Sequence, residues 1–172
     1  MERKSGMDNI VNVEDNFLTE DEHKSVLYYC ETAKYGYGES DGAGLPPTGM
    51  VSEIYEDEKI YQFFKQKTQP FAQGFELDRM YINSFAPSEN PYFHTDSRVH
   101  SDVTCLYYVN DTWELNDGGA TELYIDGNIV GVAPLPNRLL YFSADIQHRA
   151  TTFRDRYRFT LAIKYTDLEA RL

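Results

Sequence analysis

The sequence RYRFTLAIKY, residues 156–165, carries the clearest structural signal in the chain, because polar and apolar side chains alternate along it. Alternation with a period of two is typical of a β-strand whose two faces meet different surroundings. One face carries Tyr157, Phe159, Leu161 and Ile163, and the other carries Arg156, Arg158, Thr160, Ala162 and Lys164. The sequence therefore predicts a strand that packs on a core with one face and lines an interior cleft with the other.

The same period of two recurs in the preceding sequence, back to residue 78. It predicts further strands at residues 79–85, 103–109, 121–125, 128–134 and 138–144. Asp126-Gly127 lies between two of these segments and is typical of a tight hairpin turn. We therefore expect about six to eight short antiparallel strands, which suit the two sheets of a jelly roll.

The first third of the chain has helical spacing instead. Thr19 followed by Glu22 predicts a capping box at a helix start, and a second amphipathic helix is expected to end near Lys67. Between the two helices, residues 36–50 (GYGESDGAGLPPTGM) predict a Gly/Pro-rich loop that acts as a flap over a site. The expected fold is mainly β (α+β): a jelly roll with N-terminal helices packed on one sheet, as a single domain over residues 1–172.

Charge and composition argue against several classes of protein. The 172 residues carry a net charge of −12 and show no cluster of Lys or Arg, which disfavours nucleic acid as a partner. No stretch approaches the roughly 20 apolar residues of a membrane span, and the N-terminus, MERKSGMDNIVNVEDNF, lacks the apolar run of an export signal. Cys30 and Cys105 are too few for a disulfide framework. We expect a cytoplasmic or otherwise soluble intracellular protein without a membrane partner, and the oligomeric state stays open.

The sequence HTD at residues 94–96 places an imidazole and a carboxylate two positions apart. On an extended segment such residues point to the same side, so both can reach one point. His148 follows a predicted strand, which would deliver it to the mouth of the barrel. Two histidines and one carboxylate form the facial triad that holds Fe(II) and leaves positions open for a 2-oxo acid and O2. We therefore predict His94, Asp96 and His148 as metal ligands and catalytic residues, whereas the competing HSD at residues 100–102 leads directly into the next strand.

The far carboxylate of such a 2-oxo acid needs a cation inside the barrel, preferably the planar two-donor fork of arginine. Arg158 lies ten residues after His148, on the inward face of the next strand. Thr160 is the next inward position and is expected to donate a second hydrogen bond. Arg156 shares this parity and stays an alternative, as does Lys164, but Arg158 is favoured because it lies within the alternating run.

At these residues the chain resembles the prolyl 4-hydroxylase-like branch of the Fe(II)- and 2-oxoglutarate-dependent dioxygenases. It is similar in particular to the oxygen-sensing prolyl hydroxylases and their microbial relatives. The resemblance spans roughly residues 79–165 and rests on HTD (94–96), VTCLYYVND (103–111), the Gly-Gly of DGGATELYI (117–125), RLLYFSADIQH (138–148) and RYRFTLAIKY (156–165). This ordered series is far more specific than the triad alone.

The resemblance implies a double-stranded β-helix and an oxidoreductase that hydroxylates an unactivated C–H bond while 2-oxoglutarate is converted to succinate and CO2. It implies Fe(II), 2-oxoglutarate and O2 as cofactor and co-substrates, and it leaves ascorbate open as an auxiliary reductant. Tyr108, the second Tyr of the YY pair, would reach the co-substrate carboxylate. Relatives often carry a second tyrosine that contacts the co-substrate, and the matching position here is Phe85, which lacks a hydroxyl. Asn83 or Tyr81, of the same parity, is expected to make this contact instead.

Some members of this family act on proline in proteins, so a prolyl residue of a peptide or protein is the expected substrate. A free amino acid or small metabolite stays an alternative, as does a binding module that kept the jelly roll without the chemistry. Oxidation of a nucleobase is disfavoured by the net charge of −12. The loop at residues 97–102 shows no clear substrate contact, and Lys164 occupies a position where close relatives can carry an aromatic residue. Both departures leave the substrate open.

Overall fold

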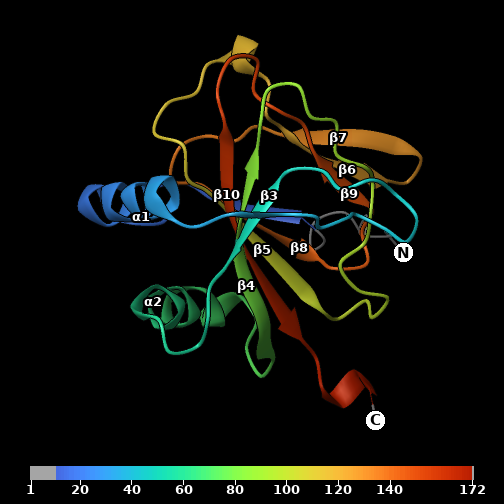
Figure 1. Ribbon diagram of the computed structural model, residues 1–172. Coiled ribbons are helices and arrows are strands. Elements are labelled where there is room, and N and C mark those ends of the chain that lie inside the picture. The colour runs from blue at the N-terminus through green and yellow to red at the C-terminus, as the bar shows by residue number, and fades with distance from the viewer. Residues whose placement is uncertain (1–10, 172) are drawn as a thin grey trace, which may run out of the picture.

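The computed structural model describes residues 11–171 and contains two antiparallel sheets (Figure 1). The large sheet has the strand order β1-β8-β5-β10-β4-β3-β2, with β1 (Val11–Glu14), β2 (Gly36–Tyr37), β3 (Met50–Glu53), β4 (Glu76–Phe85), β5 (Val103–Tyr108), β8 (Leu139–Ser143) and β10 (Arg158–Thr166). The small sheet has the order β7-β6-β9, with β6 (Thr121–Ile125), β7 (Asn128–Val132) and β9 (His148–Ala150). The predicted jelly roll is confirmed. Residues 1–10, the first part of the segment considered above for an export signal, lie outside the described part of the chain.

The predicted strands correspond to β4, β5, β6, β7, β8 and β10, with ends that differ by no more than three residues. The short strands β1, β2, β3 and β9 were not predicted, because two to four residues are too few to show an alternation. β2 and β3 take up the two ends of the predicted flap, so its loop is confined to residues 38–49. The hairpin turn is confirmed, since Asp126 and Gly127 have φ of 50° and 80° and a type I′ turn requires positive φ at both positions.

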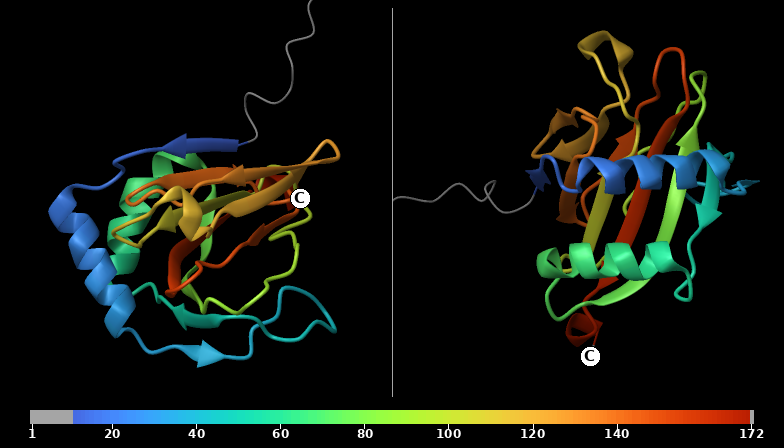
Figure 2. Two further views of the ribbon diagram at one scale, coloured as in Figure 1. Left: turned by 90° about the horizontal axis from the view of Figure 1, so that it is seen from above. Right: turned by 90° about the vertical axis from the view of Figure 1, so that its left-hand side faces the viewer.

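The two long helices, α1 (Glu20–Thr32) and α2 (Lys59–Thr68), lie across the same face of the large sheet (Figure 2). The predicted capping box of α1 is confirmed: the Thr19 hydroxyl accepts from the Glu22 N–H at 3.3 Å, and the Glu22 carboxylate accepts from the Thr19 N–H at 2.9 Å. Three short 3₁₀ turns complete the structure: η1 (Gln69–Phe71), η2 (Leu115–Asp117) and η3 (Glu169–Arg171). Within residues 11–171, no helix is long and apolar enough to cross a membrane.

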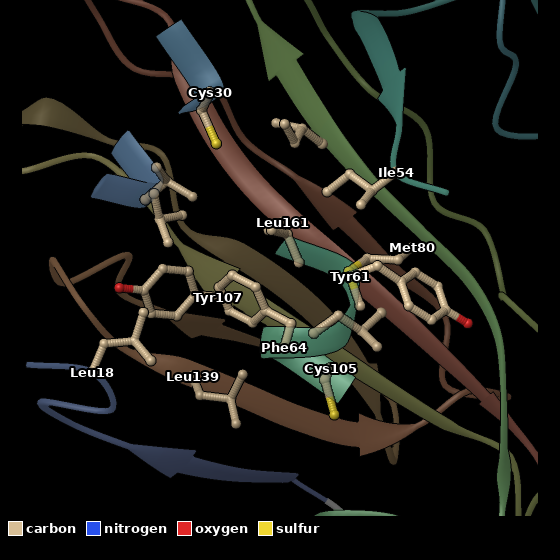
Figure 3. Packing of buried hydrophobic residues seen from close by; sticks show 14 of the residues in the cluster. Leu18, Cys30, Ile54, Tyr61, Phe64, Met80, Cys105, Tyr107, Leu139 and Leu161 are labelled. Atoms are coloured by element: carbon tan, nitrogen blue, oxygen red, sulfur yellow. The ribbon is translucent and has the colours of Figure 1, made fainter. Parts of the chain in front are cut away.

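The main core lies between these helices and the large sheet (Figure 3). β10 contributes Leu161 and Ile163, α1 contributes Val26 and α2 contributes Phe64, and all four side chains are buried. The polar side chains on the opposite face of β10 line a cavity between the two sheets. The strand at the centre of the large sheet therefore has the two unlike faces that its alternation predicted.

A second apolar cluster joins the inner faces of the two sheets. Leu123 of β6 packs there with Leu106, Phe142 and Ala162 of the large sheet. The cavity beside this cluster has a volume of about 340 Å³, which is within the range of small-molecule sites. The apolar contacts therefore join the two sheets directly beside the polar cavity.

Candidate metal centre and co-substrate pocket

A backbone bridge between two distant segments brings His94 and His148 together. The His94 N–H donates to the His148 carbonyl at 3.0 Å, and the His148 N–H donates to the His94 carbonyl at 2.9 Å. The Asp96 N–H donates to the carbonyl of Ala144 at 2.9 Å, which holds the same segment to the turn after β8. His148 is the first residue of β9 in the small sheet, so the expectation that the preceding strand delivers it is refined: β8 ends at Ser143 and the intervening turn redirects the chain.

The side chains of His94, Asp96 and His148 converge on one point. One ligand atom of each residue lies within 4.8 Å of the others. The Nε2 atoms of His94 and His148 lie 3.5 Å and 3.4 Å from the two carboxylate oxygens of Asp96. The three residues predicted as metal ligands are therefore adjacent, although they come from the β4–β5 connection and from the small sheet.

Hydrogen bonds to main-chain carbonyls set the tautomers of both histidines. Nδ1 of His94 lies 3.1 Å from the carbonyl oxygen of Tyr92, and Nδ1 of His148 lies 2.9 Å from that of Ile146. A carbonyl oxygen can only accept, so each Nδ1 carries the proton and each Nε2 keeps a free lone pair. Both lone pairs face Asp96, as metal ligation requires.

The electrostatics act differently on the three side chains. Burial lowers the pKa of His148 to about 4, so its imidazole is neutral at neutral pH. Burial also acts to lower the pKa of His94, but the hydrogen bond and charge of Asp96 outweigh it and raise the value. Burial opposes ionisation of Asp96, but Lys164 and His94 together hold the pKa of its carboxyl well below the usual range. The site therefore holds an ionised carboxylate between two imidazoles.

Arg158 lies at the far end of the cavity with its guanidinium enclosed. The residue is 1% exposed. Its Nε donates to the carbonyl of Gly119 at 2.8 Å, and its terminal nitrogens donate to the hydroxyls of Thr121 at 2.9 Å and Thr160 at 3.2 Å. Within residues 11–171 it forms no ion pair with Asp or Glu. A buried guanidinium held by neutral acceptors alone attracts an anion from outside the chain.

Tyr108 belongs to the same group of side chains. Its hydroxyl donates to Thr121 Oγ1 at 2.7 Å, and the Arg158 guanidinium carbon lies 5.5 Å from the centre of its ring. Asn83 is opposite Thr160 in the β4–β10 register and lines the cavity, as do Tyr81 and Phe85. The structure thus gathers Arg158, Thr160 and Asn83 on the wall of the cavity, with Tyr108 behind Thr121.

The side chains of the two competing assignments are engaged by other partners. Arg156 pairs with Asp117 at 2.8 Å and its guanidinium carbon lies 4.5 Å from the ring centre of Phe153. In the HSD sequence, His100 is exposed and pairs with Asp145 at 2.9 Å, whereas Asp102 pairs with Arg171 at 2.7 Å. Since His100 and Asp102 point to different partners, they do not form a second ligand pair.

The predicted flap contributes to the wall of the cavity. Glu39, Ser40, Asp41 and Thr48 all line it. Asp41 accepts hydrogen bonds from the Tyr92 N–H at 2.8 Å and from the Thr48 hydroxyl at 2.9 Å, and its other oxygen lies 3.5 Å from Nδ1 of His94. The loop at residues 38–49 therefore places a carboxylate behind one of the predicted metal ligands.

Several polar residues of the site were missed in the sequence. Thr121 is 1% exposed and accepts from both Arg158 and Tyr108. The Thr104 hydroxyl donates to Oδ2 of Asp96 at 2.6 Å. A buried hydroxyl on the inward face of each predicted strand was the available signal for both residues. Nothing local in the sequence pointed to Asp41.

Gly119 shows why the Gly-Gly sequence is needed at this point. Its φ is +79°, and an added Cβ would overlap the ring of Phe153, which is buried. We expect Gly119→Ala to lower the free energy of unfolding by about 2–4 kcal/mol, through left-handed strain and overpacking together. Gly127→Ala is the matched control, because Gly127 has a φ of +80° but open space around it, and it should cost only about 1–2 kcal/mol. Urea unfolding measures both values, and equal losses would contradict the steric argument.

Comparison with protein families identifies the class of protein. Residues 78–165 match the family model of the 2OG-Fe(II) oxygenase superfamily, which is half of the chain. The chain belongs to this superfamily. It is therefore an oxidoreductase whose family uses Fe(II), 2-oxoglutarate and O2, and the His-Asp-His group described above supplies a donor set suited to that iron. No curated protein is significantly similar to the chain in sequence.

Solved structures share the fold at low sequence identity. A prolyl-4-hydroxylase from Pseudomonas putida superposes with a TM-score of 0.70 and 16% identity, over 90% of this chain and 91% of that one. A prolyl hydroxylase from Trichoplax adhaerens, in complex with a peptide fragment of the hypoxia inducible factor oxygen degradation domain, gives a TM-score of 0.75 and 19% identity, over 95% and 86% of the two chains. A non-heme alpha-ketoglutarate-dependent carbocyclase from nogalamycin biosynthesis gives 0.68 and 11%, over 91% and 79%. At these low identities, the likeness shows a shared fold alone.

Proposed function

We propose that His94, Asp96 and His148 bind the Fe(II) of this oxygenase. The observation that carries the proposal is the convergence of one nitrogen from each imidazole and one carboxylate oxygen within 4.8 Å. The donor set fits Fe(II), since two histidines and one carboxylate bind on one face of the ion and leave the opposite positions open. Both histidines have their protons on Nδ1, so no rearrangement of the rings is needed before ligation.

Arg158 is proposed to bind the distal carboxylate of 2-oxoglutarate. Its buried guanidinium has neutral acceptors and no acid partner within residues 11–171. Burial lowers the pKa of this residue, as expected for an enclosed charge without a counter-ion. A dicarboxylate that entered the cavity would restore the balance. Thr160 and Asn83 are proposed to add hydrogen bonds from the same wall, and Tyr108 to support the site through Thr121.

In the proposed mechanism, iron, 2-oxoglutarate and O2 together supply the oxidation that places a hydroxyl group on a substrate C–H bond and yields succinate and CO2. The residues of this chain contribute position and shielding. Arg158 orients the co-substrate, and the Nδ1–H···O=C bonds fix the planes of His94 and His148. Leu106 of the apolar cluster adds an apolar side chain to the wall of the cavity.

The substrate is proposed to be a prolyl residue of a peptide or protein. The support is the resemblance of residues 79–165 to prolyl hydroxylases, and the shared fold with two enzymes of that name, one of them in complex with a peptide. The carbocyclase with the same fold shows that the architecture also serves other chemistry. A free amino acid or small metabolite is the second candidate. It is favoured by the loop at residues 38–49, which places Glu39 and Asp41 on the wall of the cavity.

The test is the formation of succinate by anaerobically purified protein to which Fe(II), 2-oxoglutarate and then O2 are added. A library of Pro-containing peptides is compared with free proline and other free amino acids, with the Asp96→Ala variant as the background. Succinate that rises with a proline peptide, together with a product heavier by one oxygen atom, is the expected result. Stimulation by free amino acids alone would replace the peptide with a small molecule. A total lack of succinate from iron-loaded protein would contradict the proposed function and favour a binding module.

A further inference from the structure

Lys164 brings a buried ammonium group into direct contact with the proposed carboxylate ligand. Its Nζ contacts Oδ2 of Asp96, and the two side chains are 15% and 9% exposed. The strand register explains the placement: Lys164 is opposite Thr104 on β5 and opposite Arg79 on β4, so the three side chains form a row across the large sheet. All three follow the inward parity of their strands, toward the cavity.

The two oxygens of Asp96 have different surroundings. Oδ2 accepts from the Thr104 hydroxyl at 2.6 Å and also contacts the ammonium of Lys164. Oδ1 lies 3.5 Å from Nε2 of His94 and Oδ2 lies 3.4 Å from Nε2 of His148, so each oxygen faces one imidazole. Within residues 11–171, however, Oδ1 has neither a hydroxyl nor an ammonium partner. Because two donors hold one oxygen, the other is the oxygen left free to bind a metal.

The second cation of the row is held by other partners. The Arg79 guanidinium forms a two-point ion pair with Glu39, at 2.8 Å and 2.7 Å, and a further pair with Glu53. Its guanidinium carbon lies 4.1 Å from the ring centre of Tyr81, and Nζ of Lys164 lies 5.6 Å from the same ring. Of the two cations in the row, Lys164 is therefore the one directed at Asp96, and Arg79 provides a matched cation that is not.

We propose that Lys164 is a positioning residue that, together with Thr104, limits Asp96 to a single metal-binding oxygen. A carboxylate can bind a metal ion through one oxygen or through both. A second oxygen from Asp96 would occupy one of the three positions that the triad leaves open for 2-oxoglutarate and O2. The buried ammonium keeps Oδ2 engaged and so preserves the third open position. This inference rests on the proposed role of Asp96 as a metal ligand.

The test uses full-length protein loaded with Co(II), whose visible absorption reports the number of ligands. X-ray absorption then counts the oxygen neighbours of the ion directly. In Lys164→Met we expect one additional oxygen neighbour, a changed visible spectrum and tighter Co(II) binding. The binding tightens because the ammonium no longer competes for the carboxylate. Lys164→Arg, which keeps a cationic donor, should retain the wild-type spectrum, and so should Arg79→Met.

Addition of 2-oxoglutarate provides a second readout that does not depend on turnover. In the wild type it should change the Co(II) spectrum strongly, and in Lys164→Met the change should be smaller, because one position is already filled. A folded Lys164→Met protein with the wild-type oxygen count and spectrum would overturn the proposal. If Lys164→Met does not fold, Lys164→Gln removes the charge with a polar side chain and is judged by the same oxygen count. Failure of the wild type to bind Co(II) at all would instead overturn the metal assignment.

Discussion

His94→Ala and Asp96→Ala are each expected to abolish the conversion of 2-oxoglutarate to succinate. Each change removes one of three side chains that converge within 4.8 Å, and a site with two protein ligands holds Fe(II) far more weakly. Loss of a residue that hydrogen-bonds to a metal ligand typically costs about 10- to 100-fold in metal affinity. Loss of a ligand itself should therefore cost more than about 100-fold. Metal titration measures the affinity, and succinate formation measures the activity.

Asp96→Ala has a second expected effect, on stability. It leaves the ammonium of Lys164, 15% exposed, without its carboxylate, and removal of one partner of a buried ion pair costs about 3–5 kcal/mol. Activity is therefore compared at a temperature where urea unfolding shows that both variants remain folded. His94→Ala leaves the Asp96–Lys164 pair in place, so its loss of activity should occur with a smaller loss of stability.

His100→Ala is the matched control for the metal assignment. Like His94, His100 is the first residue of a His-x-Asp sequence, but its imidazole is exposed and pairs with Asp145. We expect its metal affinity and succinate formation to equal those of the wild type. Full activity in His94→Ala and Asp96→Ala would refute the assignment, and a loss in His100→Ala alone would transfer it to the second His-x-Asp sequence.

The fold and the convergence of His94 with Asp96 could be predicted because their signals are local. The alternation along residues 156–165 follows from the pleat of a strand, and the i, i+2 spacing of His94 and Asp96 follows from an extended backbone. For His148, the sequence indicated only that the preceding strand would bring it to the mouth of the barrel. The contact itself depends on a backbone bridge between residues 54 positions apart, His94 and His148.

The missed residues owe their roles to pairing between segments. Thr121 contacts Arg158 because the small sheet packs over the large one. The alternation of residues along a single strand does not indicate which residues of the other sheet it will face. Parity placed Lys164 on the inward face, but its contact with Asp96 depends on where the β4–β5 connection crosses β10. Asp41 lies in a Gly/Pro-rich loop whose path is set by the partners it meets. Sequence periodicity predicts which face a residue occupies, and tertiary contacts determine its partner.

Arg158→Met is expected to raise the apparent KM for 2-oxoglutarate with a much smaller change in kcat. Methionine fills much of the same space and removes the guanidinium, which is 1% exposed. Loss of one partner of a buried, hydrogen-bonded charge pair costs about 2–5 kcal/mol of binding, which corresponds to roughly 30- to 4,000-fold in affinity. The matched control is Arg156→Met, since Arg156 pairs with Asp117 outside the cavity, and its KM should stay within about twofold of the wild type.

Stability measurements separate a role in binding from a role in folding. The Arg158 guanidinium is buried with no acid partner within residues 11–171, so it is costly to enclose in the free protein. When 2-oxoglutarate is absent, the free energy of unfolding of Arg158→Met, measured in urea, should therefore be at least as high as that of the wild type. A ligand that binds only the folded state stabilises it by RT ln(1 + L/Kd), where L is the ligand concentration, so the gain grows with the ligand concentration relative to Kd. The gain in stability on adding 2-oxoglutarate to Mn(II)-loaded protein should thus disappear in Arg158→Met and persist in Arg156→Met. An unchanged KM and an undiminished gain in Arg158→Met would assign the co-substrate carboxylate to Arg156 or Lys164 instead.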